Sequence, residues 1–421
     1  MPYNAVVQHG ANAMRIAYLV DRFPVLSQTF VINEIADHLY NGQIIDILVL
    51  EGEKYADFPA ASLPSVFLGR VRYLGIEHST VRNLINIVSK ISQNVAVIRN
   101  LLAVAMSSRK VRLDSHLRTF ALAAELARIG NYYDIIHSHF GHVAARVAKA
   151  RMFISSNTRT VATIHAFEIA RRTDATDSLI KLLIDHTDHI LPVNSVWRDQ
   201  LIESGAHKEK TIVHHMGVDV DKIRPSPIHG GVVKEFSLVI TGRMVEKKGH
   251  LILLKAISNI RNSRPEIKLK LVMVGTGPLE SSIKKEIGHL NLEGVVTLKG
   301  ALSHKHTLEV VESSDLFILP SITASDGDME GIPVALMEAM AMSIPVISTF
   351  HSGIPDLIES GVSGILVKER DADGLSMEII RMLDSSKNRQ TLGKQGRLVI
   401  EKEFNAKTLG QELRNLYKKL V

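Results

Sequence analysis

Short apolar runs alternate with longer segments of helical periodicity along most of the sequence, and this alternation restricts the fold more than any other feature. The apolar runs are rich in Ile, Val and Leu and lack a polar residue at every second position, which indicates strands buried on both faces. Such strands, separated by helices like the one predicted at Ser27–Tyr40, form a parallel sheet covered by helices. In the first half of the chain the predicted strands are Arg15–Val20, Ile44–Leu50, Asp134–His137, Thr160–His165, His189–Val193 and Thr211–His214.

The alternation stops between residues 217 and 234, where Pro, Gly and charged residues accumulate, as in Arg224-Pro225-Ser226-Pro227. This composition predicts a linker. A second series of strands and helices then begins. Its predicted strands are Phe236–Thr241, Lys268–Val274, Val295–Leu298, Asp315–Leu319, Pro345–Ser348 and Gly364–Val367, with helices at His250–Asn262 and Pro278–His289.

The two series predict an α/β protein with two doubly wound, Rossmann-like domains facing each other across a cleft, with ligands beyond the carboxyl ends of the strands. The N-terminal domain is expected over residues 14–216 and the C-terminal domain over residues 235–400. Residues 401–421 are expected to end the chain with a helix, about Ala406–Leu420, that could cross back to the N-terminal domain. A length of 421 residues agrees with this division, since one domain usually takes about 100–200 residues.

Composition excludes several classes of function. The sequence has no cysteine, so a disulfide framework, a thiolate metal site and a cysteine nucleophile are excluded. A formal net charge of +6 is too small to indicate a nucleic-acid partner. No apolar run approaches the roughly 20 residues that span a bilayer, and the start of the chain lacks the features of a signal peptide. We therefore expect a soluble cytoplasmic protein, with attachment to the inner face of a membrane left open.

The segment Glu330-Gly331-Ile332-Pro333-Val334-Ala335-Leu336-Met337-Glu338 follows a predicted strand and a polar loop. Pro333 suits the first turn of a helix, where free backbone N–H groups and the helix dipole can bind a phosphate. Along that helix the two glutamates are roughly 10 Å apart, too far for an acid–base pair on one bond. They could instead accept hydrogen bonds from two parts of one elongated ligand. Two surface glutamates beside an ordinary helix are the alternative.

A second candidate segment, Gly242-Arg243-Met244-Val245-Glu246-Lys247-Lys248-Gly249, directly follows the predicted strand Phe236–Thr241. A loop at the carboxyl end of a strand that carries Arg and Lys suits a diphosphate, because Arg243 offers a bidentate fork and Lys248 a point charge. Taken alone, the segment would more simply be a solvated basic loop.

In combination these segments resemble the retaining, nucleotide-sugar-dependent glycosyltransferases of the GT-B fold, known as glycosyl transferases group 1, with their Glu-x7-Glu motif. The resemblance covers about residues 14–400. Two N-terminal segments are similar to the bacterial exopolysaccharide, colanic-acid-type subgroup of this family: Phe23-Pro24-Val25-Leu26-Ser27-Gln28-Thr29-Phe30 and His137-Ser138-His139-Phe140-Gly141. Further matches to the family are Pro320-Ser321, Glu338-Ala339-Met340-Ala341, Pro345-Val346-Ile347 and the turn Gly353–Asp356.

The resemblance implies a role for each matching residue of the C-terminal half. Arg243 and Lys248 would bind the donor diphosphate, and Glu338 the ribose hydroxyls. Glu330, with the backbone amides of Gly331, Ile332 and Pro333, would hold the donor sugar.

In the N-terminal half, His165 matches the family histidine that faces the reacting centre, and it ends a predicted buried strand, although a hydrogen-bonded structural histidine would fit the same place. His137 and His139 could contact the acceptor or simply cap the sheet. The loop Asp21–Thr29 lacks the glycine pair that many relatives carry near the phosphate, so the identity of the acceptor cannot be transferred.

The implied activity is transfer of a sugar, with retention, from a nucleoside-diphosphate sugar to a glycan or lipid-linked glycan acceptor in exopolysaccharide synthesis. UDP is the expected nucleotide and GDP the alternative. No cofactor is expected, since the nucleotide sugar is a substrate. A nucleotide-sugar epimerase and a non-catalytic nucleotide-sugar-binding protein on the same fold are the competing hypotheses.

Two other motifs receive less weight. Asp326-Gly327-Asp328 has the spacing of a metal-binding pair, but enzymes of this fold generally need no metal, so none is expected. Gly275-Thr276-Gly277 follows a strand, yet the third glycine of a dinucleotide fingerprint would fall at Glu280.

Residues 78–113 contain no acidic residue and carry apolar residues at helical spacing. A basic amphipathic helix of this kind can lie on an anionic membrane. A packed helix with a solvated basic face fits the pattern equally well. The basic residues are Arg82, Lys90, Arg99, Arg109, Lys110 and Arg112.

Overall fold

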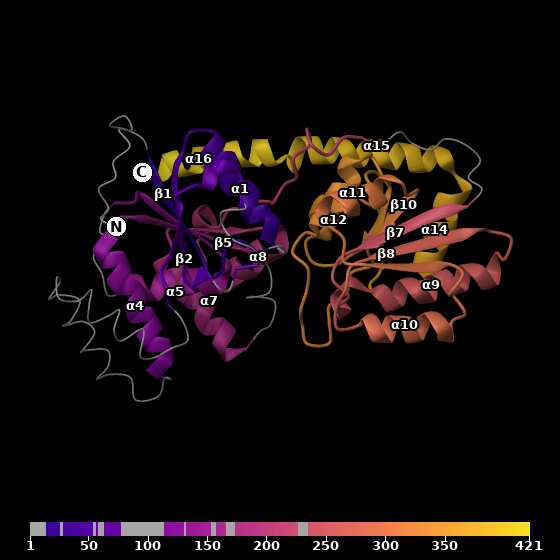
Figure 1. Cartoon of the computed structure of the whole chain (residues 1–421), viewed down its shortest axis with the longest axis horizontal. Coiled ribbons are helices and arrows are strands. Elements are labelled where there is room, and N and C mark those ends of the chain that lie inside the picture. Colours follow the sequence, from indigo (N-terminus) through magenta and orange to yellow (C-terminus); the bar gives the residue numbers. More distant parts are fainter. Residues whose placement is uncertain are drawn as a thin grey trace. The chain divides into compact units, whose positions relative to one another are not determined.

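The computed structural model of the chain describes residues 14–25, 28–53, 56–57, 63–76, 113–129, 132–152, 157–165, 173–225 and 235–421. The chain divides into two compact units, each of which contains one six-stranded sheet (Figure 1). Unit 1 consists of Met1–Pro192, Trp197–His214 and Gly410–Val421, and unit 2 consists of Val193–Val196 and His215–Leu409.

The sheet of unit 1 has the strand order β3-β2-β1-β4-β5-β6, and all of its strands are parallel. This is the doubly wound arrangement, with β1 beside β4 where the strand order reverses. Its strands are β1 (Arg15–Val20), β2 (Ile44–Val49), β3 (Val71–Tyr73), β4 (Ile135–His139), β5 (Arg159–Ile164) and β6 (His189–Pro192). Its helices are α1 (Thr29–Tyr40), α4 (Leu113–Ile129), α5 (Gly141–Arg151), α7 (Asp174–His186) and most of α8 (Ser195–Glu203).

Both faces of this sheet are buried, as the apolar runs predict. Ala17 and Leu19 of β1 pack into one core with residues of α4 and α5, such as Leu122 and Val147. The intervening residues of β1 pack on the opposite face in a second core, which also contains residues of α1 and α16 (Ala406–Leu420). The alternation of Cβ directions along a strand explains why one short run supplies both cores.

The last helix, α16, has the predicted bounds. Its residues from Gly410 onward belong to unit 1. Leu413 and Tyr417 are buried in the second core of that unit, and Arg414 forms an ion pair with Asp37 of α1. The end of the chain therefore completes the core of the unit in which the chain begins.

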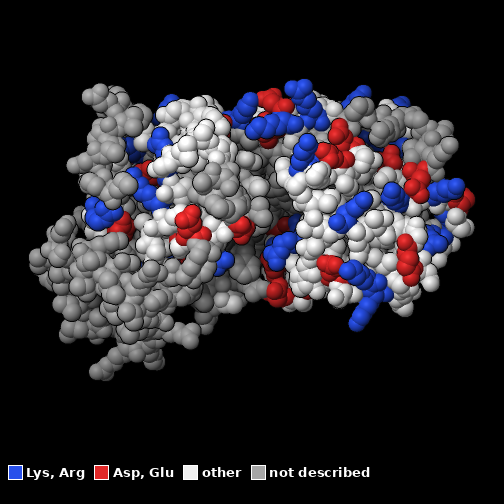
Figure 2. All heavy atoms as spheres, viewed as in Figure 1, with Lys and Arg blue, Asp and Glu red and all other residues white. Residues whose placement is uncertain are grey.

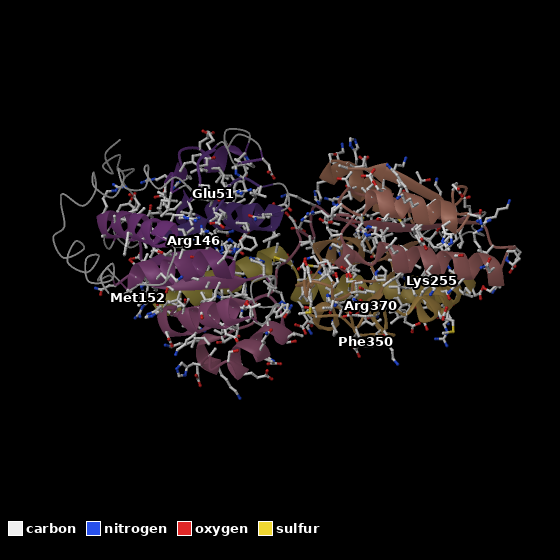
Figure 3. The ribbon with its side chains drawn as sticks, turned by 90° about the horizontal axis from the view of Figure 1, so that it is seen from below. Glu51, Arg146, Met152, Lys255, Phe350 and Arg370 are labelled. Atoms are coloured by element: carbon white, nitrogen blue, oxygen red, sulfur yellow. The ribbon has the colours of Figure 1, made fainter. Side chains whose placement is uncertain are left out.

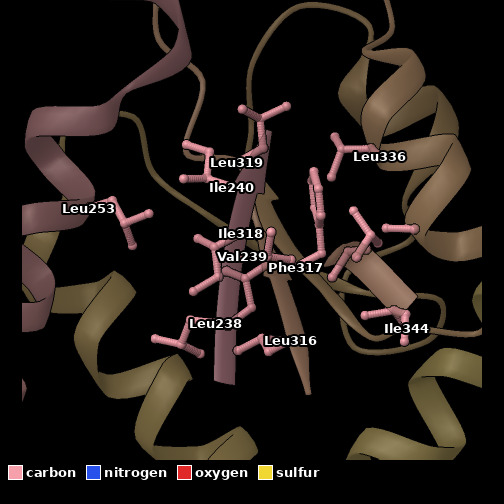
Figure 4. Packing of buried hydrophobic residues seen from close by; sticks show 14 of the residues in the cluster. Leu238, Val239, Ile240, Leu253, Leu316, Phe317, Ile318, Leu319, Leu336 and Ile344 are labelled. Carbon is pink, nitrogen blue, oxygen red and sulfur yellow. The ribbon is translucent and has the colours of Figure 1, made fainter. Parts of the chain in front are cut away.

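Unit 2 has the strand order β12-β11-β10-β7-β8-β9, again fully parallel. Figure 4 shows how Leu238, Val239 and Ile240 of the central strand β7 pack beside Phe317 and Ile318 of β10. Its strands are β7 (Phe236–Thr241), β8 (Leu269–Val274), β9 (Val296–Gly300), β10 (Leu316–Ile318), β11 (Val346–Thr349) and β12 (Ile365–Val367). Its helices are α9 (His250–Ser263), α10 (Glu280–His289), α11 (His304–Glu312), α12 (Val334–Ala341), α13 (Ile354–Leu357), α14 (Ala372–Asp384) and α15 (Ser386–Glu403).

The structure corrects the sequence prediction at two strands. The segment Thr211–His214 forms only an isolated bridge between Thr211 and Ile190, so the predicted strand there is wrong. The edge strand β3 was not predicted, because its three residues, with Arg72 at the centre, give no apolar run.

Part of the predicted linker is packed. Val218, Val220 and Ile223 are buried in the core of unit 2, and the amide of Val218 donates a hydrogen bond to the carbonyl of Phe404. Residues 226–234 lie outside the described residues, as does the predicted basic segment 78–113 apart from Leu113. Among the residues that the structure does describe, no helix is both long enough and apolar enough to cross a membrane.

Candidate active site

A basic loop at the carboxyl end of β7 leads into α9. Its last residue, Gly249, has a φ of 70°, and a Cβ there would lie 1.9 Å from the carbonyl oxygen of Pro320. Only glycine therefore allows this loop to approach the segment that follows β10. The close approach brings Lys248 beside the segment that carries Glu330.

Lys248 and Glu330, both predicted as donor-site residues, form an ion pair with 2.9 Å between Nζ and Oε1. Their side chains are only 14% and 9% exposed, so the pair is largely desolvated. Burial acts to raise the pKa of Glu330, but the charges of Lys248 and Lys247 outweigh it and hold that pKa below its usual value. Unit 2 thus contains a carboxylate and an ammonium at the position where a polar ligand is expected.

The backbone of Glu330 is held on both sides. Its N–H donates to Nε2 of His351 over 3.1 Å, and its carbonyl accepts from the hydroxyl of Ser352 over 2.6 Å. Because Nε2 of the buried His351 accepts a hydrogen bond, the ring proton lies on Nδ1, which is 2.6 Å from Oε1 of Glu369. Glu369 also accepts the amide of Thr323 at 2.8 Å.

Glu369 therefore orients His351, and His351 orients Glu330. Burial acts to raise the pKa of Glu369, but the amide of Thr323, His351 and Arg370 lower it overall. The next residue, Arg370 (Figure 3), lies 3.3 Å from the second oxygen of Glu369. The sequence analysis missed His351 and Glu369. The available signal was their position just after β11 and β12, at the ligand-binding end of a parallel sheet.

Glu338 lies in α12, which begins at Val334. Pro333 is the N-cap residue, with φ −65° and ψ 118°, so the prediction that it lies inside the first turn is wrong by one position. Its fixed φ already favours this conformation. Oε1 of Glu338 lies 2.7 Å from Nε2 of His304, and this hydrogen bond raises the pKa of His304 against a smaller opposing effect of burial. His304, at the start of α11, was also missed by sequence reasoning.

Arg243 is exposed, and no residue in the described part of the chain forms an ion pair with it. The preceding residue, Gly242, lies against Lys248, because a Cβ at Gly242 would be 3.3 Å from Cε of that lysine. The loop therefore presents two paired ammonium groups, Lys247 and Lys248, and one guanidinium available to an anion.

The pair Asp326 and Asp328 is engaged by protein groups. Nζ of Lys247 lies 3.1 Å from Oδ1 of Asp328 and 3.2 Å from the carbonyl of Met329. The amide of Asp328 donates to Oδ1 of Asp326 over 2.9 Å. An ammonium thus occupies the position that a cation would take beside Asp328.

The glycines of Gly275-Thr276-Gly277 have a packing role. A Cβ at Gly275, whose φ is 131°, would lie 1.9 Å from the carbonyl oxygen of Gly242. The loops after β8 and β7 are therefore in direct backbone contact. This contact accounts for Gly275 without a dinucleotide.

In unit 1 the three predicted histidines lie together. His137 and His139 of β4 are completely buried, and Nδ1 of His139 lies 3.0 Å from Nε2 of the partly buried His165, which follows β5. The rings of His139 and His165 stack with 5.2 Å between centroids. Burial lowers the pKa of both His137 and His165 far below the usual value, so both rings are neutral.

Charged side chains are interspersed on the visible face of the described residues, where basic and acidic groups alternate over unit 2 (Figure 2). The candidate site itself is defined by individual ion pairs and hydrogen bonds, such as the pair Lys248–Glu330.

Known families match both halves of the chain. The family described as Glycosyl transferases group 1 matches residues 224–399, and Glycosyltransferase Family 4 matches residues 88–222. WcaL of Escherichia coli K12, a glycosyltransferase named for colanic acid biosynthesis, is 30% identical over 414 residues, which cover 97% of this chain and all of WcaL. The amylovoran biosynthesis glycosyltransferase AmsK of Erwinia amylovora is 29% identical over 419 residues, covering 97% of this chain and 100% of AmsK.

Solved structures match the fold over nearly the full length. The complex of Anabaena HepE with UDP has a TM-score of 0.71 at 16% identity and covers 97% of this chain and 100% of that one. Sucrose-phosphate synthase of Thermosynechococcus elongatus has a TM-score of 0.73 at 17% identity, covering 97% and 99%. Together with the two doubly wound sheets, these matches confirm the predicted GT-B architecture.

Proposed function

Because this chain belongs to the glycosyl transferases group 1 family, we propose that it is a retaining glycosyltransferase that uses a nucleoside-diphosphate sugar as donor. The observation that carries this proposal is the buried Lys248–Glu330 ion pair in unit 2. A charged pair that is held in place before the substrate arrives needs little rearrangement to stabilise charge that develops during the reaction.

We assign the phosphates of the donor to Arg243, Lys248 and the first turn of α12. An ammonium has three donors, so Lys248 can hold Glu330 and a phosphate oxygen at the same time. As the bond between sugar and diphosphate breaks, negative charge accumulates on the leaving group, and these cationic and N–H groups stabilise it. The acceptor hydroxyl forms its bond to the anomeric carbon on the same face, and its proton passes to the leaving phosphate.

We assign the sugar ring to Glu330 and the backbone amides of Gly331 and Ile332, and the ribose to Glu338. The backbone of Glu330 is fixed by His351 and Ser352, which supports a role that requires defined placement. Glu338 lies on the adjacent helix and is already bonded to one donor, His304, so its remaining acceptor capacity is available to hydroxyl groups.

The proposed acceptor is a glycan or a lipid-linked glycan of exopolysaccharide synthesis. The support is the similarity, along almost the whole of each chain, to WcaL and AmsK, which are named for colanic acid and amylovoran biosynthesis. A lipid-linked acceptor would place the reaction at the inner face of the membrane.

UDP is the nucleotide that we propose. HepE, a structural neighbour, has been solved with UDP. A mannosyltransferase of Corynebacterium glutamicum that depends on GDP-mannose is 28% identical over 210 residues, which are 48% of this chain and 54% of that protein. GDP is therefore the alternative nucleotide.

We also propose that the reaction needs no metal, because Lys247 pairs with Asp328 and because Arg243 and Lys248 are cations in the donor loop. A chelator should therefore leave turnover almost unchanged. Loss of activity in EDTA, with recovery on adding Mg²⁺ or Mn²⁺, would contradict this and return Asp326 and Asp328 to the candidate site.

The proposed function is tested with purified protein and a panel of nucleotide sugars. A true donor at about 100 times its Kd should stabilise the fold by about 2.7 kcal/mol in a thermal-shift assay. Product analysis with the selected donor and a glycan acceptor should then show a new glycosidic bond with the anomeric configuration of the donor.

The competing functions give different products. An epimerised donor in the absence of acceptor would identify an epimerase. Donor binding without transfer or hydrolysis would identify a non-catalytic binding protein. Inversion at the anomeric carbon would keep the transferase and reject the retaining mechanism.

A further inference from the structure

Unit 1 contains a hydrogen-bonded cluster of side chains that the proposed donor site does not use. We call it the histidine–tyrosine network. It joins β1, α1, β4, the end of β5 and the C-terminal helix α16, and its members are widely separated in sequence. They are Tyr18, Glu34, His137, His139, Thr163, His165 and Tyr417.

One branch of the network runs from Thr163 to Glu34 through His137 and the two tyrosines. Tyr18 donates its hydroxyl proton to Oε1 of Glu34 over 2.7 Å. The hydroxyls of Tyr18 and Tyr417 are 3.0 Å apart, the hydroxyl of Tyr417 is 2.5 Å from Nδ1 of His137, and Nε2 of His137 is 2.8 Å from Oγ1 of Thr163.

The positions of the protons in this branch follow from Glu34. A carboxylate can only accept, so the Tyr18 proton points to Glu34 and the hydroxyl of Tyr417 must donate to Tyr18. Nδ1 of His137 then donates to Tyr417, and its Nε2 accepts from Thr163. With this assignment every contact of the branch is a hydrogen bond, and burial raises the pKa of both tyrosines so that they keep their protons.

The second branch is shorter and reaches His165. Nε2 of His139 lies 3.2 Å from Oε1 of Glu34, so this nitrogen carries a proton and donates it to the carboxylate. With this one proton on the ring of His139, its Nδ1 is an acceptor. Because it lies 3.0 Å from Nε2 of His165, that nitrogen must be the donor.

Glu34 is the group from which both branches take their direction. Burial acts to raise the pKa of Glu34, but the electrostatic interaction and the hydrogen bond with His139, followed by smaller electrostatic interactions with His137 and His38, hold that pKa well below the usual value. A neutral imidazole has one donor nitrogen and one acceptor nitrogen. For His165 the donor is Nε2, which leaves Nδ1 as an acceptor, and no described residue forms a hydrogen bond with Nδ1.

We propose that Glu34 and His139 are positioning residues that fix the proton of His165 on Nε2 and so present its Nδ1 as a hydrogen-bond acceptor for a hydroxyl group of a bound sugar. The proposal rests on the proposed function and on the role that the family resemblance implies for His165, a histidine that faces the reacting centre. In the opposite tautomer, an N–H group would replace the acceptor at the same place. A ring nitrogen in the wrong tautomer can cost several orders of magnitude in rate even where the geometry is kept.

The first test compares Glu34→Gln with Tyr417→Phe as a matched control. The amide of glutamine can donate to Nε2 of His139, which would reverse the protons of His139 and then of His165. Tyr417→Phe breaks the other branch and leaves the contact between His139 and His165 intact. Both variants lose hydrogen bonds of buried groups, so both should lower the thermal midpoint.

Only Glu34→Gln should affect turnover strongly. We expect kcat to fall by about 100-fold or more while KM for the donor changes by less than about threefold, the pattern of a residue that matters in the transition state. Tyr417→Phe should keep kcat within about threefold of the unmodified protein. Equal losses of kcat in the two variants would reduce the network to a structural role and overturn the proposal.

The second test needs neither turnover nor a variant that folds poorly. In protein labelled with ¹⁵N at its 19 histidines, NMR distinguishes protonated from unprotonated ring nitrogens. The signal that disappears in His165→Asn should show a proton on Nε2 and none on Nδ1. A proton on Nδ1 would overturn the proposal.

The two tests also separate this proposal from the proposed function. If no donor gives a product while His165 carries its proton on Nε2, the transferase assignment fails. The tautomer of His165 is then confirmed, but it has no role in sugar transfer. If sugar transfer is measured and Nδ1 carries the proton, only the positioning proposal fails.

Discussion

The candidate donor site of unit 2 and the histidine–tyrosine network of unit 1 stabilise buried polar groups in opposite ways. In unit 2 a carboxylate is balanced by an ammonium, in the pair Lys248–Glu330, and Arg243 beside it is exposed. In unit 1 the single carboxylate of the network, Glu34, accepts hydrogen bonds from a tyrosine and a histidine, and burial keeps His137 and His165 neutral.

This difference indicates different tasks. Cations that are paired but still have free donors can also bind an anion such as a diphosphate. Neutral rings in a closed network have no charge to offer an anion, but each ring nitrogen has a defined proton. Unit 2 therefore suits binding and charge stabilisation, and unit 1 suits the orientation of one hydrogen-bonding group.

The largest effect is expected from breaking the ion pair of unit 2. Lys248→Met leaves Glu330 without its closest counter-charge in a largely buried position, and removal of one partner of a buried pair typically costs about 3–5 kcal/mol. The free energy of unfolding should fall by about that amount in a urea titration, and donor binding should be lost. The double variant with Glu330→Gln should recover part of the stability and none of the donor binding.

Recovery of neither stability nor binding would mean that Lys248 contributes by packing. An unchanged free energy of unfolding in the single variant would contradict a desolvated pair. In either case the contrast with unit 1 would no longer rest on paired charges.

The next prediction separates the two glutamates of unit 2. Hydrogen bonds to a charged group contribute about 1.5–3 kcal/mol, so Glu338→Gln should weaken binding of the free nucleoside diphosphate by roughly 10- to 100-fold. It should raise KM with little change in kcat, because the ribose contact is the same before and during the reaction. Glu330→Gln should lower kcat more than nucleotide affinity, since the free nucleotide has no sugar for Glu330 to hold.

Calorimetry with nucleoside diphosphate measures both affinities. A loss of affinity in Glu330→Gln and not in Glu338→Gln would reverse the assignment. If neither variant changes binding or rate, Glu330 and Glu338 do not contact the donor, and the proposed donor site is wrong.

The fold was predictable because the strands of both units are continuous apolar runs. Predicted and observed strands such as Phe236–Thr241 share both ends, and most others agree within one or two residues. The strand signal failed at β3, where three half-buried residues at the sheet edge include Arg72. It also failed at Thr211, where a bridge of one residue replaces a strand.

The candidate site was predictable where its residues form motifs along the chain. Lys248 and Glu330 were assigned to one ligand, and the structure places them in contact. His351 and Tyr417 were missed because a single polar residue has no periodicity. Their roles arise from partners far away in the sequence: Tyr417 bonds to His137, and the bond accepted by His351 comes from the amide of Glu330.

A smaller effect is expected from the support of Glu330. His351→Ala removes the acceptor of a buried N–H group, which should cost about 1–3 kcal/mol of stability, and frees the loop that carries Glu330. Ser352→Ala is the matched control, because it removes the hydrogen bond on the other side of the same residue. It leaves a carbonyl without this donor, which is usually tolerated better than an N–H group without an acceptor. The fall in kcat should be larger for His351→Ala than for Ser352→Ala.

Equal falls in the two variants would show that His351 has no special part in placing Glu330. Of the two sites, only the histidine–tyrosine network of unit 1 would then contain a histidine that orients another group. The difference between the two units would be larger.

The smallest effect concerns pH and a third kind of histidine. His304 is 60% exposed in its side chain, and its hydrogen bond to Glu338 raises its pKa, whereas burial lowers the pKa of His137 and His165 in unit 1. A raised pKa in the folded state gives stability that is fully present below the pKa of the unfolded chain, about 6.5, and that disappears as the pH rises through the folded-state value. Solvent and salt screen so exposed a pair, so the effect should be small.

The measurement is the difference in thermal midpoint between the unmodified protein and His304→Gln. This difference should be largest at acid pH and should decline as the pH rises above neutrality. Histidines buried in the neutral form act with the opposite sign, because the unfolded chain binds their protons more readily as the pH falls. A midpoint difference that grows with pH would show that His304 is neutral in the folded protein and that Glu338 accepts a bond from an uncharged ring.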